Sequence, residues 1–262
     1  MMTLSDSENE THYENLKSLL KINYKKFTTE EARQMYDYAL NYGIKKINSG
    51  KTIYLKEVFD LYKLLLQNKL IYEGEYISPW DYKNIVSVGL RLEKMDWTKR
   101  FIQKYKNNIA EKFRNNSYNF NLASYFFSKE NYRYARKLLQ NVELKDMFYH
   151  LSAKSMFLKI YYNLNDDKAF FSLSKTFNMY LKRNKKISEY QREVHTGLVR
   201  YSEKCFRFRT RIQKHKRNAT KKEIASLQEQ IRTTKNITNM QWLLEKVEEL
   251  KNYEPNKKMK KY

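Results

Sequence analysis

The chain has 262 residues, 41 % of them hydrophobic, which is enough for one large domain or two small ones. Only 5 Gly and 2 Pro occur, and this shortage of turn-forming residues argues against an all-β fold. The 52 Lys and Arg residues outnumber the 29 Asp and Glu residues and give a formal net charge of +23, which suits an anionic partner.

The sequence indicates a protein of a reducing compartment. Cys205 is the only cysteine, so the chain can form neither an intramolecular disulfide nor a multi-cysteine metal site. Nowhere do 18 apolar residues run together, and the first residues lack the basic and apolar regions of a secretory signal. We therefore predict a soluble, cytoplasmic protein with no membrane contact.

The N-terminal part predicts a series of helices. Apolar residues recur every three or four positions over residues 13–24, which indicates a short amphipathic helix. Thr28 and Glu31 have the spacing of a capping box, so a longer helix is expected to begin there. Another apolar stripe over residues 55–66 predicts a partner helix, and residues 29–78 are expected to form an antiparallel hairpin.

A repeat with a 34-residue period follows the helix-start signal Ser78-Pro79. Small residues at two of its positions would let helix backbones approach closely, although Phe157 departs from this rule and predicts a wider gap in the last repeat. Three sets of residues keep the 34-residue step without gaps: Gly89, Ala123 and Phe157; Phe101, Ala135 and Ala169; and Leu92, Phe126 and Ile160.

Residues 85–184 resemble the tetratricopeptide repeat, and the best match is Leu122-Ala123, Phe126, Tyr132, Ala135 and Leu139. The proline that closes such repeats is missing from all three units. The resemblance implies an all-α, right-handed α-solenoid of helix-turn-helix repeats. The segment 240–246 and the Tyr-rich repeats also resemble a group of uncharacterised bacterial helical-repeat proteins, a likeness that implies no activity.

In the tetratricopeptide family, the first helix of each repeat lines a concave groove that holds an extended peptide or a partner helix. The resemblance implies that aromatic, aliphatic and lysine side chains line such a groove here, which would suit an apolar peptide carrying acidic residues. For Phe120 and Phe127, a place in the core between repeats is an equal alternative, and one of Tyr161 and Tyr162 must face outward. The implied groove residues are Lys83, Leu90, Lys94, Phe120, Phe127, Lys154, Tyr161 and Tyr162.

A strongly basic segment lies beyond the repeats. Residues 176–222 include 15 basic and 3 acidic residues, and arginines alternate with aromatic residues from position 206 onward. Such a composition can pair with phosphates and stack on bases, whereas the ordinary alternative is an amphipathic helix with a solvated basic side, and a third is an acidic protein partner. The candidate anion-binding residues are Arg207, Arg209, Arg211, Lys214 and Arg217.

Two further apolar stripes predict a C-terminal helical hairpin over residues 220–252. The hairpin could cap the last repeat, present Trp242 to another protein or promote oligomerisation. We therefore divide the chain into segments 1–28, 29–78, 79–184, 185–219, 220–252 and 253–262, the last being a basic tail that is expected to be disordered.

No motif indicates catalysis. The four histidines are scattered, no Gly-rich phosphate loop occurs, and Cys205 is more typical of a small buried hydrophobic residue than of a nucleophile. Asp166-Asp167 is expected to begin a helix rather than to form a carboxylate pair for catalysis. We predict a non-catalytic protein-interaction scaffold with no catalytic residues, cofactor or metal site; the alternative is a nucleic-acid-binding protein that uses the basic segment.

Overall fold

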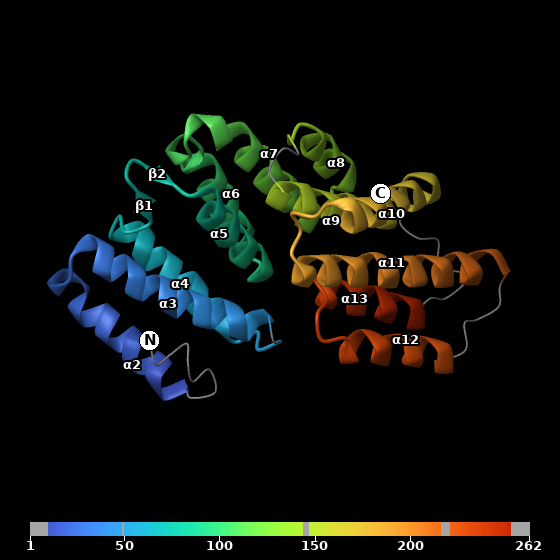
Figure 1. Cartoon of the computed structure of the whole chain (residues 1–262), viewed down its shortest axis with the longest axis horizontal. Helices are drawn as coiled ribbons and strands as arrows, with labels where there is room; N and C mark the ends of the chain where they lie inside the picture. Colours follow the sequence, from blue (N-terminus) through green and yellow to red (C-terminus); the bar gives the residue numbers. More distant parts are fainter. Residues whose placement is uncertain (1–9, 49, 144–146, 216–220, 253–262) are drawn as a thin grey trace. The chain divides into compact units, whose positions relative to one another are not determined.

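The computed structural model describes residues 10–48, 50–143, 147–215 and 221–252 (Figure 1). Within these ranges it contains twelve α-helices, two short 3₁₀ helices and one small β-hairpin, which confirms the expected helical class. None of the described helices is both long and apolar enough to cross a membrane. The chain divides into two compact units, residues 1–128 (unit 1) and 129–262 (unit 2).

Unit 1 is built from successive packed helices. Helix α3 packs against α2 and α4, α4 packs against α5, and α5 packs against both α6 and α7. Its elements are α2 (Glu10–Asn23), η1 (Tyr24–Lys26), α3 (Thr29–Asn48), α4 (Tyr54–Gln67), β1 (Tyr72–Glu73), β2 (Tyr76–Ile77), α5 (Pro79–Arg91), α6 (Met95–Lys104), η2 (Lys106–Asn108) and α7 (Glu111–Ser128).

Both helix starts that the sequence predicts in unit 1 are confirmed. The backbone N–H of Glu31 donates to Oγ1 of Thr28 at 3.2 Å, and the carboxylate of Glu31 accepts from the backbone N–H of Thr28 at 2.9 Å. These reciprocal bonds form the expected capping box at the start of α3. At the start of α5, Oγ of Ser78 accepts from the N–H of Asp81 at 3.1 Å, and Pro79 occupies the first helical turn.

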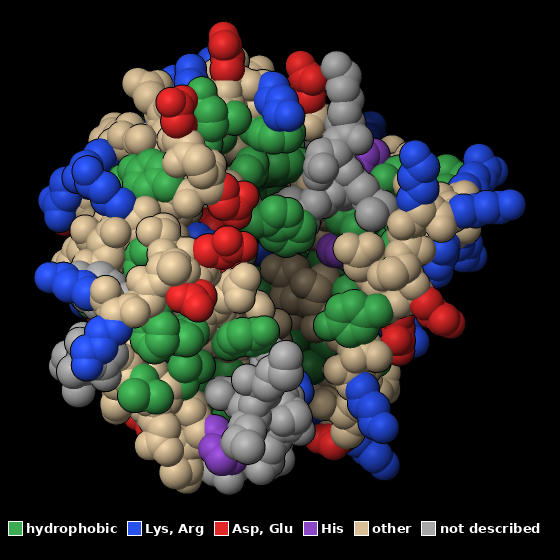
Figure 2. Space-filling model, turned by 60° about the vertical axis from the view of Figure 1, so that its left-hand side comes forward, with side chains coloured by type: hydrophobic (Ala, Val, Ile, Leu, Met, Phe, Trp, Pro, Cys, Tyr) green, Lys and Arg blue, Asp and Glu red, His purple; other side chains and the backbone are tan. Residues whose placement is uncertain are grey.

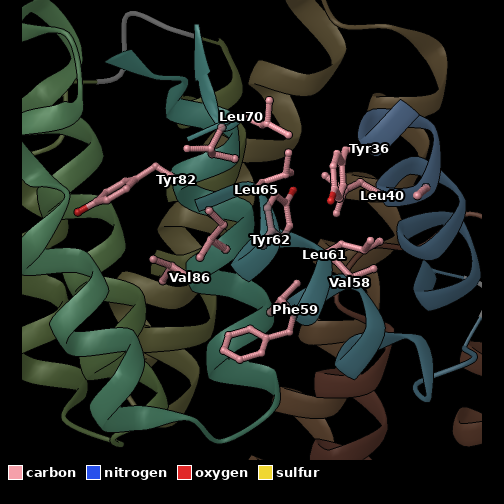
Figure 3. Close-up of a cluster of buried hydrophobic side chains, with 14 of the residues drawn as sticks. Tyr36, Leu40, Val58, Phe59, Leu61, Tyr62, Leu65, Leu70, Tyr82 and Val86 are labelled. Carbon is pink, nitrogen blue, oxygen red and sulfur yellow. The ribbon is translucent and has the colours of Figure 1, made fainter. Parts of the chain in front are cut away.

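The core of unit 1 lies where α3, α4 and α5 meet (Figure 3). Tyr36 from α3, Leu65 from α4 and Tyr82 from α5 are all completely buried there. The hydroxyl of Tyr82 donates to the backbone carbonyl of Ile102 in α6 at 2.6 Å, so the phenol satisfies its polar group while its ring packs in the core.

Close contact at two glycines brings paired helices together. A Cβ atom at Gly43 of α3 would lie 2.5 Å from Cγ2 of Val58 in α4, and a Cβ atom at Gly89 of α5 would collide with Oγ1 of Thr98 in α6. Since real Cβ atoms do not approach so closely, these contacts exist only because both residues lack a side chain. The expectation of close backbone approach is thus confirmed at Gly89.

One small β-hairpin, at residues 72–77, interrupts the helices of unit 1. Strands β1 and β2 are antiparallel, with Tyr72 opposite Ile77 and Glu73 opposite Tyr76. Gly74 has φ +65°, which is the conformation that a two-residue hairpin turn needs at its first central position. The break that the sequence indicates near Gly74 is therefore a tight hairpin.

Unit 2 contains six described helices. Helix α9 packs against α8, α10 and α11, while α11 also packs against α10 and α13. The predicted C-terminal hairpin is formed by α12 and α13, and α13 covers α11. The helices are α8 (Tyr132–Gln140), α9 (Met147–Asn163), α10 (Asp167–Arg183), α11 (Glu189–His215), α12 (Lys221–Thr233) and α13 (Met240–Lys251).

Each of the six helices expected in the three repeats is present, but the unit boundary falls within the second repeat. The first repeat (α5 and α6) and the third (α9 and α10) form packed pairs. Helices α7 and α8, in contrast, belong to different units, so the continuous solenoid stays a prediction. The tail 253–262 lies outside the described residues.

The glycine contact in the first repeat yields a stability prediction. Gly89→Val should lower the free energy of unfolding by about 2–3 kcal/mol, because the new side chain must displace Thr98 and separate α5 from α6. Ser87→Val introduces the same side chain at an exposed position of α5 and should cost less than about 1 kcal/mol. Urea unfolding measures both variants. If Gly89→Val and Ser87→Val lower the free energy of unfolding equally, the low helix propensity of valine, and not the close contact, would explain the loss at Gly89.

Candidate functional site

The implied groove residues of unit 1 divide between surface and core. The ammonium group of Lys83 lies 5.7 Å from the ring centroid of Phe120, so the structure brings these two residues together across α5 and α7. Phe120 is only 3 % exposed, which makes it a core residue and corrects its assignment to a groove. Leu90 and Phe127 are half-buried and Lys94 is exposed. We define Lys83, Leu90 and Phe127, together with Lys94 directly before α6, as the α5/α7 surface.

The implied groove residues of unit 2 divide in the same way. Tyr162 is 1 % exposed and its ring lies 5.3 Å from that of Trp242, so it belongs to the core and not to a groove. Tyr161 and Lys154 are half-buried, and burial raises the pKa of Tyr161 and lowers that of Lys154. Trp242 is itself buried, which favours the capping role of the hairpin over presentation of this ring to a partner.

The arginines at positions 207, 209 and 211 lie in the last part of α11 and have different environments. Arg207 is exposed, with its guanidinium 4.9 Å from the ring of Phe171. Arg211 is also exposed and forms an ion pair with Glu223 at 2.8 Å. The side chain of Lys214 and the whole of Arg217 lie outside the described part of the chain.

Arg209 is a core residue of unit 2, which corrects its assignment to an anion-binding surface. It is 6 % exposed, and its guanidinium lies 4.0 Å from the ring centroid of Tyr162 and 4.4 Å from that of Phe206. Among the described residues, its Nε and Nη2 atoms find no hydrogen-bond partner. Burial lowers the pKa of Arg209, while Tyr162 and Glu249 act in the opposite direction. Contact with ring faces therefore takes the place of ion pairing here.

Cys205 has the inert environment that the sequence analysis favours. The residue is completely buried, and burial raises the pKa of its thiol to about 12, although Arg209 acts in the opposite direction. Since the thiolate is the nucleophilic form, a thiol in this environment is unreactive near neutral pH.

Lys159 links α9 to the C-terminal hairpin. Its ammonium donates to Oδ1 of Asn239, directly before α13, at 2.9 Å. Burial of the ammonium lowers its pKa from the ordinary 10.5 to about 8; Glu245 opposes this shift and Lys246 adds to it.

A hollow of about 540 Å³ lies in unit 1 between α4 and α6. Its lining combines three cationic and three aromatic side chains, and we call it the basic–aromatic hollow. The lining residues are Lys63, Leu66, Gln67, Trp97, Arg100, Phe101, Lys104 and Tyr105.

The aromatic side chains of the hollow form a continuous row along α6. The rings of Trp97 and Phe101 are stacked, with centroids 5.4 Å apart and planes at 9°, and Tyr105 follows 4.9 Å from Phe101. Phe59 of α4 contacts the edge of this row, 4.6 Å from Trp97. Phe101 is buried, whereas Trp97 and Tyr105 are half-buried. The row thus has a fixed centre and two partly accessible ends.

The cations of the hollow come from both helices. Arg100 and Lys104 are exposed and stand four residues apart on α6, and Lys63 on α4 is paired with Asp60 at 2.7 Å. The sequence analysis missed this site, although the four-residue steps of the aromatic residues and of the cations along α6 were a visible signal.

A second hollow, of about 670 Å³, lies in unit 2 beside the start of α10. Arg133, Arg136 and Lys168 line it together with Asp166 and Asp167, so its charge is mixed. Asp166 accepts the N–H of Ala169 at 3.1 Å, which confirms the predicted helix-starting role of this acidic pair. The part of the chain that is described contains no group of three or more His, Cys, Asp or Glu residues able to hold a metal ion.

Comparison with protein-family models, with curated proteins and with solved structures finds no match to this chain. The resemblance to tetratricopeptide repeats therefore rests on the 34-residue pattern alone. Hydrophobic side chains lie at the surface among Lys and Arg side chains on the face drawn in Figure 2.

Arg209 yields a prediction that separates packing from charge. Arg209→Ala should lower the free energy of unfolding by about 2–3 kcal/mol, because it leaves a cavity between the rings of Tyr162 and Phe206. Arg209→Met fills much of that space without unpaired donors and should stay within about 1 kcal/mol of wild type. Arg207→Met, at the exposed neighbouring arginine, is the matched control. If Met and Ala destabilise equally in chemical unfolding, the charge itself stabilises the core.

Lys159 yields a pH prediction. The unfolded chain keeps the Lys159 proton up to about pH 10.5, whereas the folded chain releases it near pH 8, so this group makes stability rise with pH between those values. Relative to Lys159→Met, wild type should gain about 3 kcal/mol across this interval. Lys175→Met, at an exposed position of α10, controls for the loss of one charge. Parallel pH profiles for wild type and Lys159→Met in urea unfolding would contradict the assignment.

Proposed function

We propose that the protein is a non-catalytic, cytoplasmic helical scaffold that binds an apolar peptide segment carrying acidic residues. The observation that carries this proposal is the packing of α5 against α7, the first helices of two successive repeats, with the half-buried Lys83 beside the buried ring of Phe120. A cation beside partly buried apolar side chains suits a ligand that is both apolar and acidic.

The rest of the α5/α7 surface supports this proposal. The step of 37 residues that separates Lys83 from Phe120 also separates Leu90 from Phe127. If the two first helices run parallel, as in a tetratricopeptide array, Leu90 would lie beside Phe127 about two turns further along. Half-buried apolar side chains can lose more exposed area on binding, while the exposed Lys94 can orient an acidic residue without first breaking a buried contact.

Nucleic-acid binding through the segment at residues 207–217 is the second candidate and has less support. Arg209 is occupied in the core and Arg211 is paired with Glu223, which leaves Arg207 as the one described arginine of the segment that is exposed and has no carboxylate partner. A single exposed arginine can neutralise few phosphates, and affinity for nucleic acid grows with the number of phosphates neutralised.

The test is selection of peptides from a displayed random library on wild-type protein. We expect enrichment of peptides that combine apolar and acidic residues, and at least tenfold weaker binding to Phe127→Ser and to Lys94→Glu. Lys56→Glu reverses an equally exposed lysine on α4 and should change the affinity less than twofold at physiological salt. Circular dichroism confirms that each variant is folded.

Two results would contradict the proposed function. One is enrichment of peptides without acidic residues. The other is full retention of binding by folded Phe127→Ser and Lys94→Glu proteins, since the selected peptides would then bind elsewhere.

A further inference from the structure

We propose that the basic–aromatic hollow of unit 1 binds a nucleotide, with the phosphate held by Arg100 and Lys104 and the base stacked on the aromatic row of α6. The site goes beyond the proposed scaffold function, because it involves α4 and α6 and not the α5/α7 surface. A free mononucleotide and one nucleotide of a single strand share this chemistry, and the experiment below distinguishes them.

The aromatic row provides the platform for the base. The ring planes of Trp97 and Phe101 are nearly parallel, and the buried Phe101 holds the row in place from within the core. Trp97 and Tyr105 both line the hollow and are partly accessible. Because the ammonium of Lys104 lies 5.2 Å from the ring centroid of Tyr105, the base is expected to stack on Trp97, whose position is already fixed. Fixed rings lower the entropic cost of binding, and every base has a face that can stack.

The cations provide the phosphate contacts. Arg100 and Lys104 are one helical turn apart on the same helix as the rings, so they reach into the hollow from the same side. The planar guanidinium of Arg100 can donate two hydrogen bonds to phosphate oxygens, and Lys104 adds a second positive charge. Among the residues that the structure describes, no carboxylate lines the hollow, which leaves a net positive lining.

The size and the composition of the hollow favour a nucleotide over a peptide. A volume of about 540 Å³ falls within the range of small-molecule sites. An apolar peptide anchor would have to desolvate Lys63, Arg100 and Lys104 without supplying charge. A nucleotide meets the rings with its base and the cations with its phosphate, so both kinds of lining gain a partner.

The experiment measures the affinity of the full chain, washed free of nucleic acid in high salt, for labelled adenosine monophosphate and for a labelled 12-nucleotide single strand of deoxythymidine. Arg100→Glu and Lys104→Glu should each weaken binding at least tenfold. Lys99→Glu is the matched control, because Lys99 is an exposed neighbour on α6 that does not line the hollow, and it should change the affinity less than threefold. Trp97→Leu should weaken binding at least tenfold, whereas Trp97→Phe keeps a ring and should lose less than threefold.

Thermal unfolding confirms that each variant is folded before its affinity is compared. Binding of the mononucleotide identifies a free nucleotide as ligand, and binding of the strand alone identifies single-stranded nucleic acid; both support the proposal. Equal losses in Lys99→Glu and Arg100→Glu would overturn it, because general charge would then explain binding. No binding of either probe at millimolar protein, or competition by an acidic peptide alone, would also overturn it. Phe127→Ser should leave nucleotide binding unchanged, which keeps this test separate from that of the scaffold function.

Discussion

Contact between helices at two residues without side chains sets the geometry of unit 1. Gly43 lets α3 approach Val58 of α4, and Gly89 lets α5 approach Thr98 of α6. The helices thus form two closely packed pairs, α3 with α4 and α5 with α6, and α4 and α6 are the second helices of these pairs. Among the described residues, Phe59 of α4 contacts Trp97 of α6, and the basic–aromatic hollow lies between the same two helices. The position of the hollow is thus related to where the helices are held close.

A partly buried ion pair joins two of these helix pairs. Arg33 of α3 binds the carboxylate of Asp81 in α5 at 2.8 Å, that of Asp37 at 2.9 Å and the carbonyl of Leu70 at 3.3 Å. Burial alone would lower the pKa of Arg33, but Asp81 and Asp37 raise it, so the guanidinium stays charged. Because such pairs are costly to leave half-formed, this contact specifies the place of α5 more than it adds stability.

Helix starts can be predicted from the sequence because they depend on residues close together in the chain. The burial of a single side chain cannot, because it depends on how the helix is rotated about its axis. The starts of α3, α5 and α10 follow from Thr28, Ser78 and Asp166, because each cap is completed within three residues. A 34-residue period identifies equivalent positions in successive repeats but not the side of the helix that faces outward. The sequence therefore leaves Phe120 open between groove and core, and it does not decide which of Tyr161 and Tyr162 is buried; Phe120 and Tyr162 both lie in the core. The hollow was missed because residues of α4 and α6, about thirty positions apart, form it together.

The distribution of charge shows why the position of a basic residue matters more than its abundance. Residues 129–262 contain 32 basic and 14 acidic residues, whereas residues 1–128 contain 20 and 15. Net charge acts over about 8–10 Å at ordinary ionic strength and can steer a polyanion toward unit 2. Recognition, however, requires cations and rings fixed within a few ångströms of one ligand. The guanidinium of Arg209 contacts aromatic rings inside the protein. Arg100 and Lys104, in contrast, are exposed and lie beside partly accessible rings. The less basic unit is therefore the one in which we propose the anion site.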